Sequence, residues 1–203
     1  MRTLPATGRG RATLDRILDA AALLFYEQGV RATGLDQIIA VSRTGKGQLY
    51  HYFDGKADLV LAVIDRQIEQ VLGAQQPLLG ELTSAAAIDA WLALLVDLHE
   101  HSDHPVRCPL GALAAELAEN DPLAREALAR GFRRWSGHIA DGLRAIQATG
   151  GLDPKADCDA LAEATLAAYQ GGLLLAQAHG SLAPLRASLA GARTALQAHG
   201  LGA

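Results

Sequence analysis

The chain has 203 residues, of which half are apolar and only 4% aromatic, and it carries a net charge of −4. No apolar run approaches the roughly 20 residues of a membrane span, and the N-terminus lacks the apolar segment of a secretory signal. Two cysteines are too few for a disulfide framework. These features exclude membrane and disulfide-rich secreted classes, and we expect a cytoplasmic protein with a substantial core.

Alanine and leucine dominate the composition, which favours helix, and no run of alternating β-branched residues predicts a strand. Residues 1–11 lack a core pattern, so we expect a disordered basic arm with Arg2, Arg9 and Arg11. From residue 12 to 28, apolar residues recur at helical spacing, and Gly29 follows as a typical residue after a helix end. The chain therefore begins with an arm and one long helix.

Residues 35–56 read LDQIIAVSRTGKGQLYHYFDGK. Leu35, Ile38 and Ile39 have the i, i+3, i+4 spacing of a short helix, and residues 41–44 interrupt that period. A second helix begins near Gly45, for which Thr44 is a candidate N-cap. Two short helices joined by a tight turn indicate a helix-turn-helix, so residues 12–56 are predicted to be a DNA-binding domain.

The second of these helices carries side chains suited to reading DNA. Only the first turns of a helix in the major groove reach the base edges, where Lys46 can donate to guanine and Gln48 can pair with adenine. Gly45 and Gly47 leave room for backbone amides to approach a phosphate. The alternative is an ordinary helical hairpin with a solvated polar face.

The segment S-x-T-G-K-G-Q-L-Y-H-Y-F-x-x-K, preceded by ILDAAALLFYEQGVRATGLDQI, resembles the signature of the TetR/AcrR family of bacterial transcriptional regulators. The resemblance is strong over residues 16–61 and looser elsewhere. It implies a three-helix reading head on a helical body, and phosphate contacts at the positions of Thr33, Tyr50 and Lys56. Arg43 stands where the family normally has glycine, at a cost on the order of 1 kcal/mol if the backbone is left-handed. The candidate DNA-contacting residues are Thr33, Arg43, Thr44, Lys46, Gly47, Gln48, Tyr50, His51 and Lys56.

Charge is distributed unevenly along the chain. Residues 1–56 hold eight Lys and Arg against five Asp and Glu, a net of +3, whereas residues 57–203 hold ten against seventeen, a net of −7. A basic head on an acidic body is typical of a protein that binds a polyanion through one domain. Chance scatter of charges is the alternative.

Residues 57–203 are predicted to form a ligand-binding and dimerisation domain, for a total of about nine helices in an all-α fold. One apolar stripe in the penultimate helix repeats at three and four residues. The resemblance implies a homodimer through a four-helix bundle, and hence a palindromic operator. The alternative is that this stripe packs within its own chain. The candidate dimer residues are Leu161, Thr165, Ala168, Tyr169, Gly172, Leu173 and Ala176.

The middle helices are expected to hold an effector site, since small-molecule sites combine apolar walls with a few hydrogen-bonding groups. Each candidate has an ordinary core role as its alternative. His99, His101, His104 and Cys108 include competent metal ligands, but their spacing matches no known metal motif, so we expect no metal and no cofactor. The candidate effector-binding residues are Trp91, His99, Cys108, Trp135, His138, Tyr169 and Gln170.

We therefore predict a ligand-released repressor that binds operator DNA as a homodimer. The alternative is the same DNA-binding fold acting as a redox or electrophile sensor through Cys108, which begins a C-x-x-G-x-L-A-x-E segment found in a subgroup of the resembling family. Helix N-termini and nearby positive charge stabilise thiolates, whereas simple packing of a small apolar side chain is the other interpretation. No phosphate loop, nucleophile elbow or zinc-protease motif is present in the sequence, so an enzyme is not expected.

Overall fold

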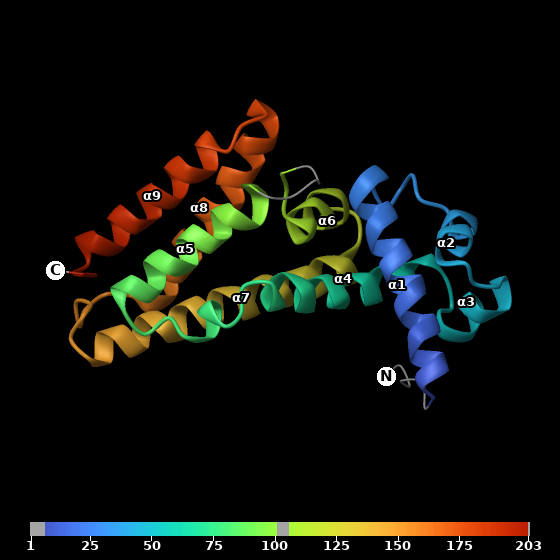
Figure 1. Ribbon diagram of the computed structural model, residues 1–203, viewed down its shortest axis with the longest axis horizontal. Helices are drawn as coiled ribbons and strands as arrows, with labels where there is room; N and C mark the ends of the chain where they lie inside the picture. Colours follow the sequence, from blue (N-terminus) through green and yellow to red (C-terminus); the bar gives the residue numbers. More distant parts are fainter. Residues whose placement is uncertain (1–6, 101–105, 203) are drawn as a thin grey trace. The chain divides into compact units, whose positions relative to one another are not determined.

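The computed structural model describes residues 7–100 and 106–202, which contain nine α-helices, one short 3-10 helix and no strand (Figure 1). The predicted all-α fold is confirmed. The helices are α1 (Gly8–Gln28), α2 (Leu35–Ser42), α3 (Lys46–Tyr52), α4 (Lys56–Gly73), η1 (Leu78–Gly80), α5 (Ala85–Glu100), α6 (Pro109–Leu117), α7 (Pro122–Ala148), α8 (Cys158–His179) and α9 (Ala183–Ala198).

Helix α1 begins four residues earlier than the sequence pattern predicted. Thr7 is its N-cap, and the Thr7 hydroxyl accepts a hydrogen bond of 3.1 Å from the Gly10 amide. Arg9 and Arg11 therefore lie in the first turn of a helix, and their placement in a disordered arm was wrong. The cap supplies the start signal, because it satisfies an amide that the helix itself leaves unpaired. Arg2 lies outside the described residues.

The two short helices α2 and α3 begin in the same way. In each, a glycine is the N-cap and a glutamine three residues later accepts the glycine amide: Gly34 to Gln37 Oε1 at 2.7 Å, and Gly45 to Gln48 Oε1 at 2.9 Å. Thr44 is therefore not the N-cap of α3, as its position had suggested. A glycine N-cap has no side-chain oxygen, and the side-chain hydrogen bond of each cap is the one that the glutamine accepts from the N-cap amide.

Arg43 ends α2 in the left-handed region, with φ 52° and ψ 43°. Its amide donates to the Ala40 carbonyl oxygen at 3.2 Å, and the following amide, of Thr44, donates to the Ile39 carbonyl oxygen at the same distance. The left-handed turn expected at this position is present. A non-glycine residue here costs on the order of 1 kcal/mol, which the closed turn and the packing of both helices offset.

The chain divides into two compact units. One comprises residues 1–70 together with 109–129, and the other comprises 71–108 together with 130–203. The boundaries of the compact units therefore differ from the predicted domain boundary at residue 57. Helix α6 and the start of α7 belong with the first four helices, although they lie many residues later in the sequence.

In the first unit, side chains from α1 to α4 share one core. The Tyr52 hydroxyl donates to the Gly10 carbonyl oxygen at 3.1 Å, which ties α3 to the start of α1. Arg66 on α4 bridges two carboxylates of α1, at 3.0 Å to Asp15 and 2.6 Å to Asp19. The central core residues, each exposed by 1% or less, are Ile17, Ala21, Ile38, Leu49, Phe53, Leu59 and Ile64.

In the second unit, a buried glutamine lies between two tryptophans. The Gln75 side-chain oxygen accepts both indole N–H groups, at 3.0 Å from Trp91 and 3.2 Å from Trp135. Its amide nitrogen donates to the Val71 carbonyl oxygen at 2.8 Å. Both indoles are fully buried. The side-chain oxygen of one glutamine thus accepts hydrogen bonds from both buried indole N–H groups.

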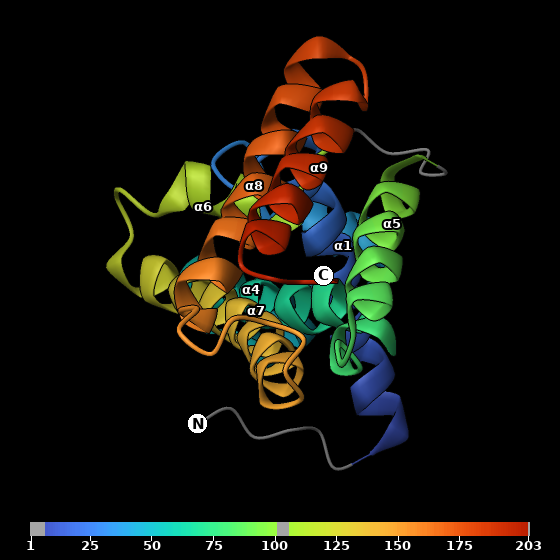
Figure 2. The same ribbon diagram turned by 90° about the vertical axis from the view of Figure 1, so that its left-hand side faces the viewer.

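Helices α8 and α9 run side by side at the C-terminal end of the chain (Figures 1 and 2). Close approach is possible because Gly172 has no side chain: a Cβ there would lie 2.1 Å from the Ser188 Oγ and 3.1 Å from the Leu185 Cα. The small residue at this crossing lets the two backbones approach.

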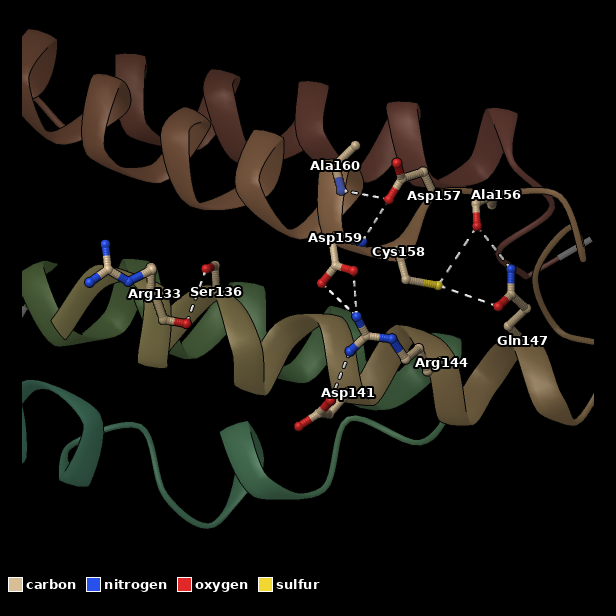
Figure 3. A network of polar contacts seen from close by, with 10 residues as sticks. All are labelled: Arg133, Ser136, Asp141, Arg144, Gln147, Ala156, Asp157, Cys158, Asp159 and Ala160. Atoms are coloured by element: carbon tan, nitrogen blue, oxygen red, sulfur yellow. Dashed lines mark hydrogen bonds and ion pairs between the residues drawn. The ribbon is translucent and has the colours of Figure 1, made fainter. Parts of the chain in front are cut away.

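A polar network fastens the start of α8 to α7 (Figure 3). The Arg144 guanidinium reaches Asp141 at 2.9 Å and both oxygens of Asp159 at 2.5 Å. Gln147 donates to the carbonyl oxygen of Ala156 at 3.0 Å, and its own side-chain oxygen lies 3.5 Å from the Cys158 sulfur. Burial raises the pKa of the Cys158 thiol, so this cysteine stays protonated and serves as a structural contact.

Candidate functional site

Helix α3 exposes most of the side chains that were predicted to contact DNA. Lys46, Gly47, Gln48, Tyr50 and His51 are all solvent-exposed, while Leu49 between them is fully buried. Leu49 therefore fixes which face of α3 points outward. A short helix with a polar exposed face and a single buried anchor has the dimensions and chemistry of a major-groove reader.

Two of the exposed side chains on α3 also interact with each other. The Lys46 ammonium lies 6.0 Å from the centroid of the Tyr50 ring, within the outer range of a cation–π contact. Arg43 is exposed one turn earlier, and Lys56 is partly exposed at the start of α4. These four residues place three positive charges around the polar face, as a phosphate-contacting surface requires.

Thr33 and Thr44 do not present their hydroxyl groups to solvent. Thr33 is 1% exposed; its hydroxyl donates to the Gly29 carbonyl oxygen at 2.7 Å and accepts from Gln28 Nε2 at 3.1 Å. Thr44 is 9% exposed and its hydroxyl pairs with that of Ser42 at 2.8 Å. Both hydroxyl groups are thus paired inside the fold, and the contacts of the two threonines with DNA stay predictions.

The Gln48 side chain makes one hydrogen bond within the turn and keeps further hydrogen-bonding capacity. Its side-chain oxygen accepts the Gly45 amide, which orients the side chain along the start of α3. A carbonyl oxygen has a second lone pair, and the amide nitrogen remains a donor, so the same side chain still offers the acceptor and donor that adenine requires. The hydrogen bond to Gly45 reduces the conformational freedom of the Gln48 side chain.

Four of the seven predicted effector-binding residues lie together in the second unit. The His99 Nε2 lies 2.9 Å from the Tyr169 hydroxyl, and the Trp135 ring meets the Tyr169 ring edge-on at a centroid distance of 5.6 Å. Cys108, which is buried, acts electrostatically on Tyr169. We call His99, Cys108, Trp135 and Tyr169 the effector cluster.

The effector cluster is polar but uncharged. Burial lowers the pKa of His99, so the imidazole is neutral at pH 7. Burial, together with the neighbouring Cys108, raises the pKa of Tyr169 far above its ordinary value, so its hydroxyl keeps its proton. The His99–Tyr169 contact is therefore a hydrogen bond between neutral groups.

The indole N–H groups and the other predicted effector-binding residues, His138 and Gln170, differ in their hydrogen bonding. The indole N–H groups of Trp91 and Trp135 both donate to Gln75, so these two donors are paired within the core. Effector binding by the two tryptophans stays a prediction. His138 is half-buried. Gln170 is also half-buried, and its Nε2 is a buried donor for which the described part of the chain offers no acceptor.

The histidine-rich segment falls partly outside the described residues, which include neither His101 nor His104. Within residues 7–100 and 106–202, no group of three or more His, Cys, Asp or Glu side chains has the arrangement of a metal site. In the same ranges, no helix combines the length and the apolar character that crossing a membrane requires.

The apolar stripe of α8 lies inside the protomer. Thr165, Tyr169, Leu173 and Ala176 are each exposed by 4% or less, and Gly172 faces α9. These side chains are buried by packing within their own chain. Leu161 and Ala168 are half-buried at the edge of the stripe. The contact of these residues with a second chain stays a prediction.

A second stripe on α8, which was not among the predicted residues, is exposed. Leu174 is 67% exposed and Leu175 is 51% exposed. They continue a line of exposed small residues, and this line also has spacings of three and four residues. The signal was present in the sequence, because α8 is apolar on two faces instead of one. We call this the outer stripe; its members are Ala160, Ala164, Ala167, Gly171, Leu174, Leu175 and Ala178.

Comparison with known proteins agrees with this geometry. Residues 17–63 match the model described as bacterial regulatory proteins of the tetR family, and residues 84–190 match the C-terminal domain of LmrA/YxaF-like transcriptional regulators. The chain belongs to the TetR family. It is a DNA-binding transcriptional regulator, and residues 17–63 contain the helix-turn-helix built from α2 and α3.

Individual relatives cover most of the chain. An uncharacterized HTH-type transcriptional regulator in the lacX 3′ region of Lactococcus lactis subsp. lactis is 35% identical over 170 residues, 81% of this chain and 83% of that protein. The transcriptional regulator AcuR of Cereibacter sphaeroides is 31% identical over 189 residues, 85% and 83% respectively. The crystal structure of a TetR transcriptional regulator from Chloroflexus aurantiacus is also similar, with a TM-score of 0.83 and 25% sequence identity. The match covers 94% of this chain and 97% of that one.

Proposed function

We propose that this TetR-family regulator is a repressor that binds a palindromic operator as a homodimer and is released by a small-molecule effector. The observation that carries the DNA-binding part is the polar, exposed face of α3 held outward by buried Leu49. In a homodimer, two such faces related by a twofold axis read two equivalent half-sites.

The outer stripe of α8 supports the homodimer. Two leucines exposed by more than half on one helix face, with alanines and a glycine along the same line, form an apolar surface that allows close helix packing. A second copy of the chain offers the same surface, so a twofold contact would bury both. Helix α9 lies alongside α8 and would complete a four-helix bundle.

The effector cluster supports a neutral effector. His99 and Tyr169 are uncharged, so a strongly charged ligand would find no compensating charge between them. The buried Nε2 of Gln170 is a donor that an effector with a carbonyl or hydroxyl oxygen would satisfy. Release requires the effector to favour the DNA-incompetent conformation by about 1–3 kcal/mol.

Selection of bound DNA from a random pool tests the proposed function. The wild-type chain should enrich a palindrome with two half-sites. Recovery of DNA with no shared motif would refute sequence-specific repression, and recovery of a single unpaired site would refute operator binding as a twofold dimer. Reciprocity supplies the test of release: any compound that displaces the operator must bind more weakly to the DNA complex than to free protein.

Lys56→Ala and Gln48→Ala should weaken operator binding in different ways. Loss of Lys56 removes a phosphate contact, so affinity should fall for all sequences alike and the salt slope should fall by about one. Loss of Gln48 should relax preference at particular base positions, at a cost of about 1–3 kcal/mol for the favoured base. Gel-shift titrations on the selected operator and its single-base variants, at several salt concentrations, measure both. Identical behaviour of the two variants would refute the assignment of α3 as the base-reading helix.

Oxidation should leave operator binding unchanged. Cys108 is 6% exposed. Cys158, the other cysteine, is buried, and its thiol donates a hydrogen bond to Gln147. Because both thiols are buried, neither is placed to react readily. Mild hypochlorite treatment should change the operator affinity of wild type and Cys108→Ser by less than about twofold. Loss of binding in wild type alone would instead establish the cysteine-sensor alternative.

A further inference from the structure

Glu116, on α6, holds the loop between α1 and α2. Its Oε2 accepts the Val30 amide at 2.8 Å and its Oε1 accepts the Arg31 amide at 2.6 Å. Each carboxylate oxygen thus receives one of two successive backbone N–H groups. All three residues belong to the same compact unit, although α6 lies more than eighty residues later in the sequence.

The loop conformation matches this carboxylate. Gly29 has a φ of +85°, a value that an L side chain adopts only with strain, and a Cβ at this position would lie 3.1 Å from the Glu116 Oε2. The Gly29 amide itself closes α1 by donating to the Phe25 carbonyl oxygen. The next two amides are then left to converge on one anion, in the manner of a backbone nest. Here the anion is supplied by the chain's own side chain.

The same loop is tied to the start of α2. The Thr33 amide donates to the Val30 carbonyl oxygen at 3.2 Å, and the Thr33 hydroxyl donates to the Gly29 carbonyl oxygen at 2.7 Å. Gln28 Nε2 reaches both Thr33 Oγ1 at 3.1 Å and Gln37 Oε1 at 3.4 Å, and Gln37 in turn caps α2. A continuous series of hydrogen bonds therefore connects the two amides held by Glu116 to the first turn of α2.

We propose that Glu116 is a positioning residue for operator binding, which acts from α6 through the Val30 and Arg31 amides to set the placement of α2 and α3. The inference rests on the proposed function. Glu116 touches no base or phosphate in this role; it fixes the loop that carries the reading helices.

Glu116→Gln tests the role with minimal change of shape. A carboxamide has one oxygen and one NH₂, so one of the two amides would face a donor instead of an acceptor. Operator affinity should fall about tenfold, equivalent to about 1.4 kcal/mol, which is within the range of one hydrogen bond to a charged group. The salt slope should be unchanged, because no phosphate contact is lost. Glu119→Gln is the matched control: it makes the same charge change at an exposed site two residues after α6, and should leave affinity within about twofold of wild type.

Hydrogen exchange provides the readout that a merely stabilising contact would not give. In Glu116→Gln, exchange at the Val30 and Arg31 amides should rise at a temperature where the variant remains fully folded by circular dichroism. Affinity should fall at that same temperature. Wild-type affinity in a variant with faster exchange, or lost affinity that merely follows a lost folded fraction, would overturn the inference. Failure of the wild-type chain itself to select an operator would overturn the proposed function instead.

Discussion

Leu174→Glu is expected to make the protein monomeric. Operator binding should then weaken at least about a hundredfold, because a dimer gains that much avidity from its second DNA-binding domain. Leu174 is 67% exposed in the protomer, so the substitution should leave the fold of the single chain intact. In the proposed four-helix bundle, the same position would lie between two copies of α8. A buried carboxylate there, facing its twofold mate, would have neither solvent nor a partner charge.

Leu123→Glu is the matched control for this prediction. Leu123 is 69% exposed and lies on α7, outside the outer stripe, so the two substitutions change the same side chain at nearly equal exposure. Sedimentation or light scattering gives the mass of each variant, and gel-shift titration gives its affinity. Dimeric Leu174→Glu with normal affinity would show that the outer stripe is not the interface. Equal effects of both substitutions would point to a general effect of the added charge.

Gln75→Leu is expected to lower the free energy of unfolding by about 2–6 kcal/mol, because two buried indole donors would lose their acceptor at about 1–3 kcal/mol each. Gln75 is 1% exposed and its oxygen accepts both Trp91 and Trp135. Leucine is similar in size, so the loss should come from the unpaired N–H groups more than from packing. Urea unfolding followed by far-ultraviolet circular dichroism measures the difference.

Two comparisons isolate the hydrogen bonds. Gln70→Leu makes the same substitution at an exposed position of α4 and should change stability by less than about 0.5 kcal/mol. When Trp91 and Trp135 are both replaced by phenylalanine, no indole donor remains, and Gln75→Leu should then cost less than half as much. An undiminished cost in that background would mean that Gln75 stabilises the core in some other way.

Local features of this chain could be predicted from its sequence. The helix-turn-helix follows from short-range spacing: Ile38 and Leu49 are each fully buried, as the apolar pattern requires, and Gln48 and Tyr50 on either side of Leu49 are exposed. The left-handed turn at Arg43 was expected from its position in the family signature and is present. Such features depend on residues within one or two helical turns, whose geometry is fixed by the chain itself.

Choices between equivalent local solutions required the tertiary structure. Thr44 was the predicted N-cap of α3, but in the packed turn its hydroxyl pairs with Ser42, and the N-cap is Gly45, whose amide donates to Gln48. Thr33 has a hydroxyl group that could contact a phosphate, but in the folded loop this hydroxyl points inward and donates to the Gly29 carbonyl oxygen. Hydrogen-bonding side chains have several satisfactory partners, so their final choice depends on which partner the fold brings near.

Long-range relations were outside the reach of sequence patterns. Helix α8 is apolar on two faces, and periodicity alone does not say which face packs on α9 and which leaves Leu174 exposed. Nothing near Glu116 in the sequence indicates that its carboxylate receives the amides of Val30 and Arg31. Helical periodicity reports only that a face is apolar or polar; which elements meet is decided by the packing of the whole unit, where each face is buried against the surface that fits it.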